Sequence, residues 1–387
     1  MEINTLVHYN FWKMKIKVLS LFLLSYCFSS LAQISDTIKK DSSITFLFVG
    51  DVMGHMPQVR AAYDSFNDKY DYNPCFSYIK QYIQDADVSI ANLELVLGGT
   101  PYSGYPTFSS PDDVAVALKN AGIDVIALAN NHCYDKGKYG FERTIKIIDS
   151  LNFLRMGTYN DIVEKYNNYP LIINLKGIKI AFFNYTYGTN GLKPQEPNII
   201  NYISLDKIKE DIKKADSLKC DLKILFIHWG LEYELQPNNE QIKLAKAFST
   251  MGFDAIVGSH PHVVQSYDEI VINDSLSNIK KIPVLYSLGN FISNQRDRYR
   301  DCGVLFGIKF YLNNKGKFET FYIPYWVYKG HIKGKYQYYV IPIDDYLNNN
   351  LDFTLPESDY LRLKEASEDI EKQLFNLKRI ENTIKNK

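Results

Sequence analysis

The sequence predicts an α/β protein, in which buried strands alternate with amphipathic helices. Short apolar runs typical of buried strands occur six times, at residues 44–49, 87–91, 124–129, 222–227, 254–257 and 283–288. Helical segments separate several of these runs, as in folds built from repeated strand–helix units. The chain has 387 residues, of which 46% are hydrophobic, enough for one large domain with or without an appendage.

Two of the predicted helices carry clear start and stop signals. Residues 110–113 combine a capping serine, a proline in the first turn and two aspartates near the positive end of the helix dipole. Gly122 ends that helix, and Gly252 ends a second one predicted at residues 238–251.

The N-terminus has the pattern of an export signal. Residues 13–17 carry three lysines, residues 18–31 are mostly apolar, and Ala32 ends a site with small residues that a signal peptidase accepts. The apolar stretch is shorter than the ~20 residues of a membrane span. We therefore predict a signal peptide at residues 1–32, with Met14 as an alternative start. The mature protein is then expected in the periplasm or at the cell surface, either free or membrane-associated.

The order of predicted elements changes after about residue 300. Strands without intervening helices are predicted at residues 303–312, 318–325 and 336–342, and a polar helical tail is predicted at residues 357–386. The predicted domains are therefore residues 44–310 and residues 311–387. The second region either completes the core or is appended to it.

The composition argues against two classes of protein. A net charge of zero without a long basic run gives no support for nucleic-acid binding, so we expect no nucleic acid among the partners. The cysteines beyond residue 32 are widely spaced and lack the paired spacing of a zinc ribbon; they are Cys75, Cys133, Cys220 and Cys302. An exported protein can form disulfides, but the spacing favours no pairing, and we expect free thiols.

Polar side chains follow each of the six predicted strands. They include Asp51, Glu94, Asn131, His132, His228, His260, His262 and Asn290. In α/β sheets, ligands bind at the carboxyl ends of the strands, so we expect these groups to share one rim. Each residue alone has a simpler explanation as a turn or capping residue. So many of them after successive strands are hard to explain in that way.

The predicted rim offers both nitrogen and oxygen ligands. This mixture suits divalent ions such as Mn, Fe or Zn, with Mg as a further option, whereas a structural zinc site more often uses cysteines. Two ions bridged by one carboxylate would require this many ligands. Such a pair, ~3.5–4 Å apart, clamps the attacking and leaving oxygens of a displacement and activates water. We therefore predict one or two divalent metal ions as cofactors.

Six motifs resemble, in order, those of the CapA family of capsule (poly-γ-glutamate) biosynthesis proteins. They lie at residues 50–53, 92–94, 129–132, 228–230, 258–263 and 286–291, so the resemblance covers roughly residues 44–310. CapA proteins in turn resemble calcineurin-like metallophosphoesterases. The resemblance implies a metallophosphatase-like sandwich of two sheets flanked by helices, followed here by a β-rich extension and the helical tail.

The resemblance also implies roles for individual residues. The implied metal ligands are Asp51 and His262 for one ion, Asn131, His228 and His260 for the other, and Glu94 as a bridge between the two. His132 would be the general acid that protonates the leaving group, and Asp135 would orient it.

Two positions depart from the phosphoesterase pattern. Met53 stands where that pattern has a histidine, and Glu94 stands where it has the shorter aspartate. One extra carbon at a bridge moves the metals by more than the ~0.5 Å that a productive site tolerates. His55 is a substitute ligand with a different spacing. The resemblance therefore leaves open whether both metal positions are filled, and it does not by itself imply phosphoesterase activity.

An arginine-rich segment follows the sixth strand. Arg296, Arg298 and Arg300 can bind carboxylates or phosphates through bidentate hydrogen bonds. We predict Arg296, Arg298 and Asn290 as substrate-binding residues. The alternative is a solvated loop with local pairs between arginine and aspartate.

Three functions compete. The first is an exported enzyme of capsule biosynthesis that performs metal-dependent hydrolysis or transfer on an anionic envelope polymer such as poly-γ-glutamate. The second is a phosphomonoesterase or phosphodiesterase. The third is a non-enzymatic, polymer-binding partner of a membrane-bound synthase or export complex, a reading that Met53 favours.

Overall fold

The computed structural model describes residues 43–273, 279–314 and 316–380, so the predicted signal peptide at residues 1–32 lies outside the described residues. The site discussed below, and the sheets apart from residues 43–44 of the first strand and residues 310–311 of a later one, belong to the compact unit formed by Thr45–Lys309 and Phe318–Lys387. Within the described part of the chain, every helix is too short or too polar to cross a bilayer.

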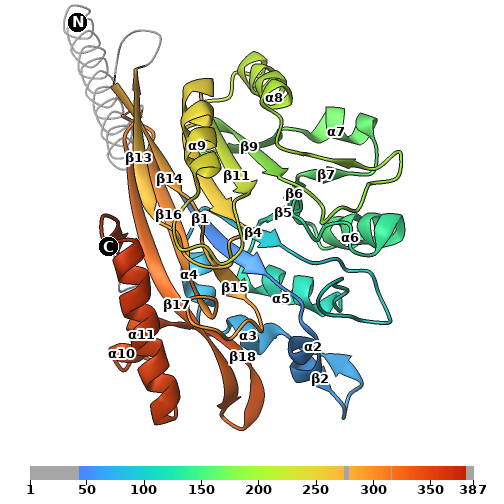
Figure 1. The fold of residues 1–387 in the computed structure, drawn as a ribbon, viewed down its shortest axis with the longest axis vertical. Helices are drawn as coiled ribbons and strands as arrows, with labels where there is room; N and C mark the ends of the chain where they lie inside the picture. The colour runs from blue at the N-terminus through green and yellow to red at the C-terminus, as the bar shows by residue number, and fades with distance from the viewer. Residues whose placement is uncertain (1–42, 274–278, 315, 381–387) are drawn as a thin grey trace, which may run out of the picture. The chain divides into compact units, whose positions relative to one another are not determined.

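The strands form two large sheets (Figure 1). The first sheet has the order β18-β17-β16-β1-β4-β5-β6, with β15 paired to β1 and β19 paired to β17. Its strands are β1 (Ser43–Val52), β4 (Val88–Leu93), β5 (Val125–Ala127), β6 (Leu154–Met156), β15 (Asn290–Ile292), β16 (Cys302–Tyr311), β17 (Phe318–Ile332), β18 (Lys335–Pro342) and β19 (Lys378–Arg379). The second sheet has the order β13-β14-β12-β11-β9-β8. Its strands are β8 (Leu171–Leu175), β9 (Ile178–Thr186), β11 (Leu222–His228), β12 (Ala255–Ser259), β13 (Tyr267–Asn273) and β14 (Ile279–Leu285).

The remaining elements are helices and two short strand pairs. The pairs are β2 (Tyr63–Asp64) with β3 (Lys69–Tyr70), and β7 (Thr158–Tyr159) with β10 (Ile199–Ile200). The helices are α2 (Met56–Ala62), α3 (Asn73–Phe76), α4 (Lys80–Gln84), α5 (Asp113–Ala121), α6 (Gly137–Ser150), α7 (Ile162–Asn168), α8 (Leu205–Ser217), α9 (Asn239–Met251), α10 (Ile343–Leu347) and α11 (Glu357–Gln373).

Strand β1 explains why the two sheets stack. Its side chains alternate between two buried faces, as the pleat of a strand requires. Phe46 and Phe48 meet the second sheet, where their rings lie 5.5 Å from Phe182 and 5.7 Å from Phe226 between centroids. Leu47 belongs instead to the hydrophobic cluster that the first sheet shares with α3, α4, α5 and α6. A strand buried on both faces has the continuous apolar sequence that β1 shows.

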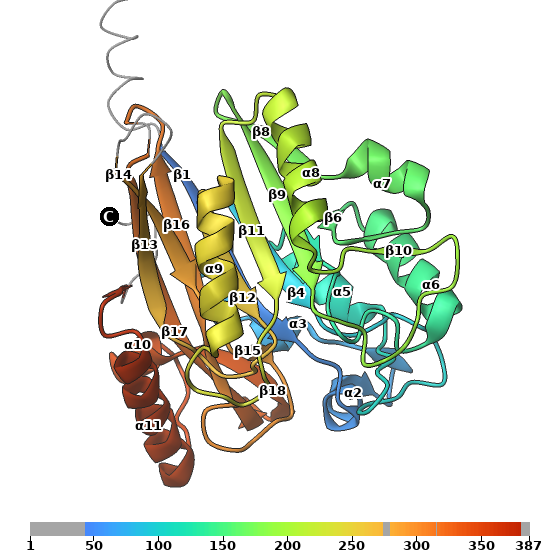
Figure 2. The same cartoon turned by 45° about the horizontal axis from the view of Figure 1, so that its top comes forward.

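Helices cover the outer face of each sheet. Residues of α8 and α9 share a second hydrophobic cluster with β9, β11, β12 and β14, and Figure 2 shows both helices lying along that sheet. The predicted α/β sandwich of two sheets flanked by helices is therefore confirmed.

The helix signals noted in the sequence are confirmed except for the capping serine of α5. The N-cap of α5 is Asp112, and Ser110 Oγ is buried without a hydrogen-bond partner among the described residues. In α9 the Asn238 side chain accepts a hydrogen bond from Gln241 N, and the Gln241 side chain accepts one from Asn238 N. Gly122 after α5 and Gly252 after α9 both adopt the left-handed conformation that ends a helix.

The C-terminal region differs from the prediction in one respect. Strands β16, β17 and β18 join the first sheet beside β1, and α11 packs on β17 (Figure 1). The continuous helix predicted for residues 357–386 is wrong beyond Gln373, because Lys378–Arg379 form β19 and pair with Phe321 and Tyr322 of β17. Residues 381–386 of that prediction lie outside the described part of the chain. Cys75, Cys133 and Cys302 are buried free thiols, and Cys220 is a partly buried one.

Candidate metal centre

Asp51 is positioned by an irregularity in β1. The pairing of β1 with β4 shifts register between Val49 and Asp51, which turns the Asp51 carboxylate inward. A side chain at Gly50 would place its Cβ 1.9 Å from the Gly289 carbonyl oxygen, so this close approach requires glycine. The two carboxylate oxygens of Asp51 accept hydrogen bonds from Asn92 Nδ2 at 2.7 Å and from the backbone N–H of His260 at 3.2 Å.

Glu94 follows β4 and lies at the centre of the site. Its backbone N–H donates to the Val52 carbonyl at 3.0 Å, and its side chain is fully buried. Glu94 Oε1 is 3.7 Å from His228 Nε2 and 3.6 Å from His262 Nε2. One carboxylate oxygen of the first sheet thus faces two imidazoles carried by the second.

His228 ends β11 and has both ring nitrogens engaged. Its Nδ1 lies 3.0 Å from Ser259 Oγ, and its Nε2 lies 2.9 Å from Asn131 Oδ1. As a hydrogen bond, the contact with Asn131 Oδ1 requires the proton on Nε2. Binding a cation through Nε2 would require the other tautomer, in which Nδ1 carries the proton and donates it to Ser259 Oγ. This hydrogen bond is of the kind that orients metal-binding histidines.

His260 and His262 are held in an unusual turn after β12. Both have positive φ angles, 100° for His260 and 59° for His262, which cost a non-glycine residue about 1–3 kcal/mol each. His262 Nδ1 lies 3.0 Å from Asn290 Oδ1 and 3.2 Å from Asp51 Oδ2. Strain of this size persists only where the surroundings hold it, and it is concentrated at functional sites.

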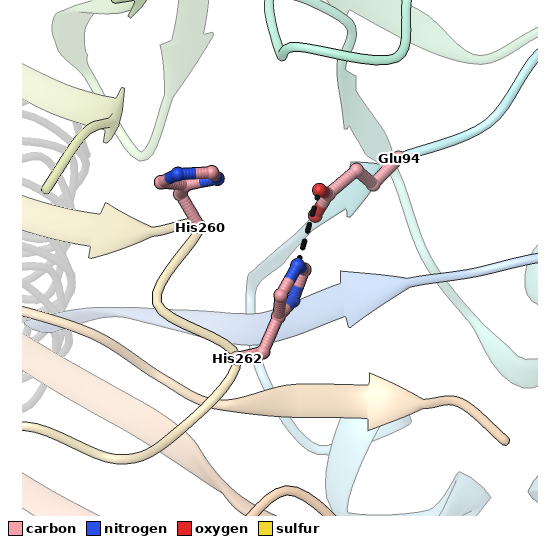
Figure 3. Close-up of side chains that lie close together, drawn as sticks. All are labelled: Glu94, His260 and His262. Atoms are coloured by element: carbon pink, nitrogen blue, oxygen red, sulfur yellow. Dashed lines mark ion pairs between the residues drawn. The ribbon is translucent and has the colours of Figure 1, made fainter. Parts of the chain in front are cut away.

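These side chains form two groups that can each hold a metal ion. The groups are Glu94, His260 and His262, drawn in Figure 3, and Asp51, Glu94 and His228; within each group the ligand atoms lie within 4.8 Å of one another. Glu94 belongs to both groups, whereas the other members are combined differently from the implied ligand sets, because His260 groups with His262 and Asp51 groups with His228. The bridging role of Glu94 stays a prediction. Within the centre, two side-chain atoms, Glu94 Oε1 and His260 Nδ1, are buried without a hydrogen-bond partner among the described residues. Buried polar atoms are normally satisfied, so these two fit ligands of a cation.

Burial favours the metal-binding form of two histidines but disfavours the metal-binding form of Glu94. Burial, and then the neighbouring histidines, lower the pKa values of His228 and His260 well below the ordinary range, so both rings are neutral. Burial, followed by the nearby Asp51 carboxylate, raises the pKa of Glu94 well above its ordinary value. A divalent cation would offset both causes of that rise and keep Glu94 ionised.

His132 and Asp135 form a separate pair. His132 Nδ1 lies 2.8 Å from Asp135 Oδ2, and the same oxygen accepts the backbone N–H of Phe108 at 2.7 Å. The Phe108 ring packs edge-on against the imidazole, with centroids 4.7 Å apart. This arrangement directs a proton on Nδ1 towards Asp135 and leaves Nε2 as the nitrogen that can exchange a proton with a substrate.

The positions that depart from the phosphoesterase pattern contribute no ligand to either group. Met53 is buried within the hydrophobic cluster of the first sheet. His55 caps α2, with Nδ1 3.2 Å from Gln58 Oε1, and burial lowers its pKa to about 4. Neither residue belongs to the two groups of possible metal ligands among the described residues.

The predicted substrate-binding residues are placed differently from one another. The guanidinium of Arg298 pairs with Asp369 of α11 at 2.7 Å, and Arg296 Nη1 donates to the Val327 carbonyl at 2.7 Å. Neither contact is to a residue of the metal centre. Asn290 is buried beside His262, where its side chain serves to orient that ring. Substrate binding by these three residues stays a prediction, and their contacts within the protein give each of them a structural role.

Sequence reasoning missed three residues that shape the site. Asn92 Nδ2 donates to both Asp51 and Glu94, and so ties the two carboxylates together. Tyr187 follows β9, a strand that the sequence did not predict, and its ring centroid lies 4.6 Å from that of His260. The Tyr233 ring lies 6.0 Å from His262. Asn92 stands inside one of the motifs noted above, and Tyr233 lies three residues after another, but no role was assigned to them.

Comparisons with known proteins match this chain to proteins of capsule synthesis. The family model described as "Bacterial capsule synthesis protein PGA_cap" matches residues 45–295. "Capsule biosynthesis protein CapA" of Bacillus anthracis is 28% identical over 294 residues, covering 72% of this chain and 66% of that protein. "PGA biosynthesis protein CapA" of Bacillus subtilis (strain 168) is 26% identical over 304 residues, covering 72% of this chain and 71% of that protein. The chain therefore spans about two thirds of the length of these relatives.

Solved structures with a similar fold share little sequence with this chain. The NAD nucleotidase (NadN) of Haemophilus influenzae aligns with a TM-score of 0.46 and 15% identity, covering 89% of this chain and 65% of that one. The calcineurin-like phosphoesterase YfkN of Bacillus subtilis aligns with a TM-score of 0.42 and 15% identity, covering 86% of this chain and 98% of that one.

Proposed function

Because the chain belongs to the bacterial capsule synthesis protein family PGA_cap, we propose that it is a metal-dependent hydrolase or transferase acting on an anionic polymer of the cell envelope. The observation that carries the proposal is the placement of Glu94. Its buried, unpartnered Oε1 faces histidines of the second sheet, and it belongs to both groups of possible metal ligands.

The proposed ligands divide into two sets that share Glu94. Asp51 and His262 lie 3.2 Å apart on one side, and Asn131 Oδ1 lies 2.9 Å from His228 Nε2 on the other. His260 completes the second set, as the family resemblance implies. By distance alone His260 groups with His262, and Asp51 with His228, so the assignment of each ligand to an ion is part of the proposal. Bound divalent ions would supply positive charge that polarises the bond under attack and activates water. The ions we consider are Mn, Fe, Zn and Mg, since the donor set mixes imidazole with oxygen ligands.

The His132–Asp135 pair is proposed as the proton donor. Asp135 holds the imidazole through Nδ1, and Phe108 packs against its ring. The opposite nitrogen is then available to give a proton to the leaving group, a role typically worth about 10²–10⁴-fold in rate.

The proposed substrate follows from the family. The names of two relatives refer to capsule and PGA biosynthesis, and poly-γ-glutamate is a polyanion, which a cationic metal centre attracts. We propose that residues 44–310 carry this activity and that residues 1–32 direct export to the periplasm or the cell surface. A membrane-bound synthase or exporter of the polymer is the proposed protein partner.

The proposal is tested by incubating the metal-loaded protein with poly-γ-glutamate of defined length and analysing the products by size-exclusion chromatography and mass spectrometry. We expect metal-dependent shortening of the chains, or their transfer to an added amine acceptor, and loss of either reaction when the metal is removed by a chelator. A panel of chromogenic phosphate esters is assayed in parallel.

Three results would contradict the proposal in different ways. Turnover of phosphate esters alone would identify a phosphoesterase. Tight polymer binding without turnover would identify a binding partner of a synthesis or export complex, the function that the buried Met53 favours. Turnover unaffected by the chelator would remove the metal from the mechanism.

A further inference from the structure

We propose that Arg300, stacked on Tyr233, binds an anionic group of the substrate beside the metal centre. The proposal rests on the proposed function in one respect, because it assigns a residue to the same site. It adds a substrate contact that lies outside the predicted substrate residues Arg296, Arg298 and Asn290.

Tyr233 is fixed to the turn that carries the metal-binding histidines. Its backbone N–H donates to the Pro261 carbonyl at 2.8 Å, and its own φ angle is 70°. Its ring lies 6.0 Å from the His262 ring, and its hydroxyl accepts a hydrogen bond from Gln295 Nε2 at 3.3 Å. These backbone and side-chain contacts hold the Tyr233 ring at the edge of the centre, where 38% of the residue is exposed. The ring can therefore serve as a platform for a neighbouring side chain.

Arg300 is held on that platform. Its Cζ lies 3.6 Å from the centre of the Tyr233 ring, a close cation–π contact. Its backbone carbonyl accepts a hydrogen bond of 2.8 Å from Asn290 Nδ2, and Asn290 Oδ1 contacts His262. The Arg300 guanidinium contacts the Tyr233 ring, and that ring in turn lies beside the His262 ring. These two contacts place the guanidinium near the metal centre.

Arg300 differs from its two neighbours in what it binds. The guanidinium groups of Arg296 and Arg298 are engaged by Val327 and by the acidic side chains of α11. Among the described carboxylates, Arg300 pairs only with Asp297, at 2.9 Å, and Asp297 is 76% exposed. Pairs with so exposed a partner contribute little to stability. A substrate carboxylate or phosphate can therefore replace Asp297 at little cost and bind the fork of the guanidinium.

The Glu232 carboxylate, next to Tyr233 in the sequence, is expected to weaken the binding of an anion at Arg300. Glu232 precedes Tyr233 and is exposed. Burial, and then the Glu232 carboxylate, raise the pKa of Tyr233; burial, followed by Glu94 and Glu232, raises the pKa of Tyr187. Tyr187 lies against His260, with its backbone N–H bonded to the His228 carbonyl at 3.0 Å. An anion bound at Arg300 thus lies near the Glu232 carboxylate as well as near Asp297, and removing the charge of Glu232 should strengthen its binding.

The test uses isothermal titration calorimetry on the metal-loaded full chain with a γ-glutamyl hexamer. We expect Arg300→Gln to weaken binding by about 10-fold or more, since a charge-assisted hydrogen bond contributes to that extent. Glu232→Gln is expected to tighten binding by a few-fold, and Arg60→Gln, an exposed arginine of α2, to leave it unchanged. Bound metal and the unfolding temperature should remain those of the native protein in all three variants.

A matched ligand separates charge recognition from packing. A hexamer with its free carboxylates converted to amides should bind the native protein and Arg300→Gln equally weakly. Tyr233→Phe, which keeps the ring, should bind the charged hexamer almost as the native protein does, whereas Tyr233→Ala should resemble Arg300→Gln.

The subsite is refuted if Arg300→Gln binds the charged hexamer as tightly as the native protein, if it loses affinity for both hexamers equally, or if the native protein binds neither hexamer. Binding that depends on Arg300 but is followed by no reaction would support the subsite and count against the proposed enzyme. Cleavage of the polymer that is indifferent to Arg300→Gln would do the reverse.

Discussion

Replacement of Glu94 by glutamine should have opposite effects with and without metal. Glu94 is fully buried, and its Oε1 lies within 3.7 Å of two imidazole nitrogens without a hydrogen-bond partner among the described residues. Without metal, this carboxyl must either stay protonated or bury a charge beside Asp51. Glu94→Gln removes the ionisable group at almost constant volume, so the metal-free variant should be at least as stable as the metal-free native protein above pH 6.5.

The metal-loaded state should respond in the other direction. Altering groups that merely support a ligand costs about 10–100-fold in metal affinity, so loss of a shared ligand should cost more than about 100-fold. A metal at 1,000 times its Kd stabilises the fold by about 4 kcal/mol, and a 100-fold weaker site forfeits about 2.7 kcal/mol of that gain. For domains of 150–250 residues each kcal/mol is worth about 2–4 °C in Tm, and somewhat less in a longer chain.

The assay is thermal and urea unfolding of both proteins in chelator and in a titration of Mn²⁺ or Zn²⁺. Asp211→Asn is a suitable control, since Asp211 lies on α8, outside the site, where it accepts a hydrogen bond from Tyr185 of β9. Asp211→Asn should change the free energy of unfolding by the same amount with and without metal. The reasoning is refuted if metal stabilises Glu94→Gln as much as it stabilises the native protein. It is also refuted if Glu94→Gln is as much less stable than the native protein in chelator as it is in metal.

Three further predictions follow from individual contacts. His132→Ala should lower turnover by about 10²–10⁴-fold while the metal content measured by elemental analysis stays unchanged, because its ring contacts Asp135 and belongs to neither group of metal ligands; a parallel loss of metal would contradict this. In chelator, stability measured by urea unfolding should fall as pH rises above 6.5. The raised pKa of Glu94 makes the folded chain keep a proton that the unfolded chain releases above its ordinary value of 4.5. Between pH 4.5 and 6.5 the lowered pKa values of His55, His228 and His260 act the opposite way, and a Glu94→Gln variant that still shows the fall at high pH would disprove this cause. Arg362→Leu should cost about 3–5 kcal/mol in urea unfolding because it leaves the buried Asp301 carboxylate, 2.6 Å away, without its main cation; a loss under 1 kcal/mol would show that Trp326 and the other neighbours satisfy it.

Local sequence patterns predicted the strands of the site well, since each has a strong local cause. The apolar run that forms β1 is buried on both faces, and caps such as Asn238 and Gly252 act within a few residues. The polar residues after β1, β4, β11 and β12 could be predicted to converge because parallel strands place their carboxyl ends together.

Other features depend on contacts that no local pattern reports. Tyr187 reaches His260 only because β9 pairs with β11 in the second sheet. The three arginines after β15 look alike in sequence, yet α11 engages Arg298 and leaves Arg300 stacked on Tyr233. The helical pattern of the C-terminal tail was overridden after Gln373 because the edge of β17 offers backbone partners to β19.

The central claim, that the two sheets together hold divalent metal, is tested most directly by measuring metal stoichiometry. Elemental analysis is carried out on the native protein, on His260→Ala/His262→Ala and on His331→Ala, an exposed histidine that contacts Tyr336 away from the site. We predict one or two divalent ions per chain in the native protein and in His331→Ala, and their loss in the double variant. A native protein that binds no metal after reconstitution, or a double variant that retains the full complement, would contradict the claim.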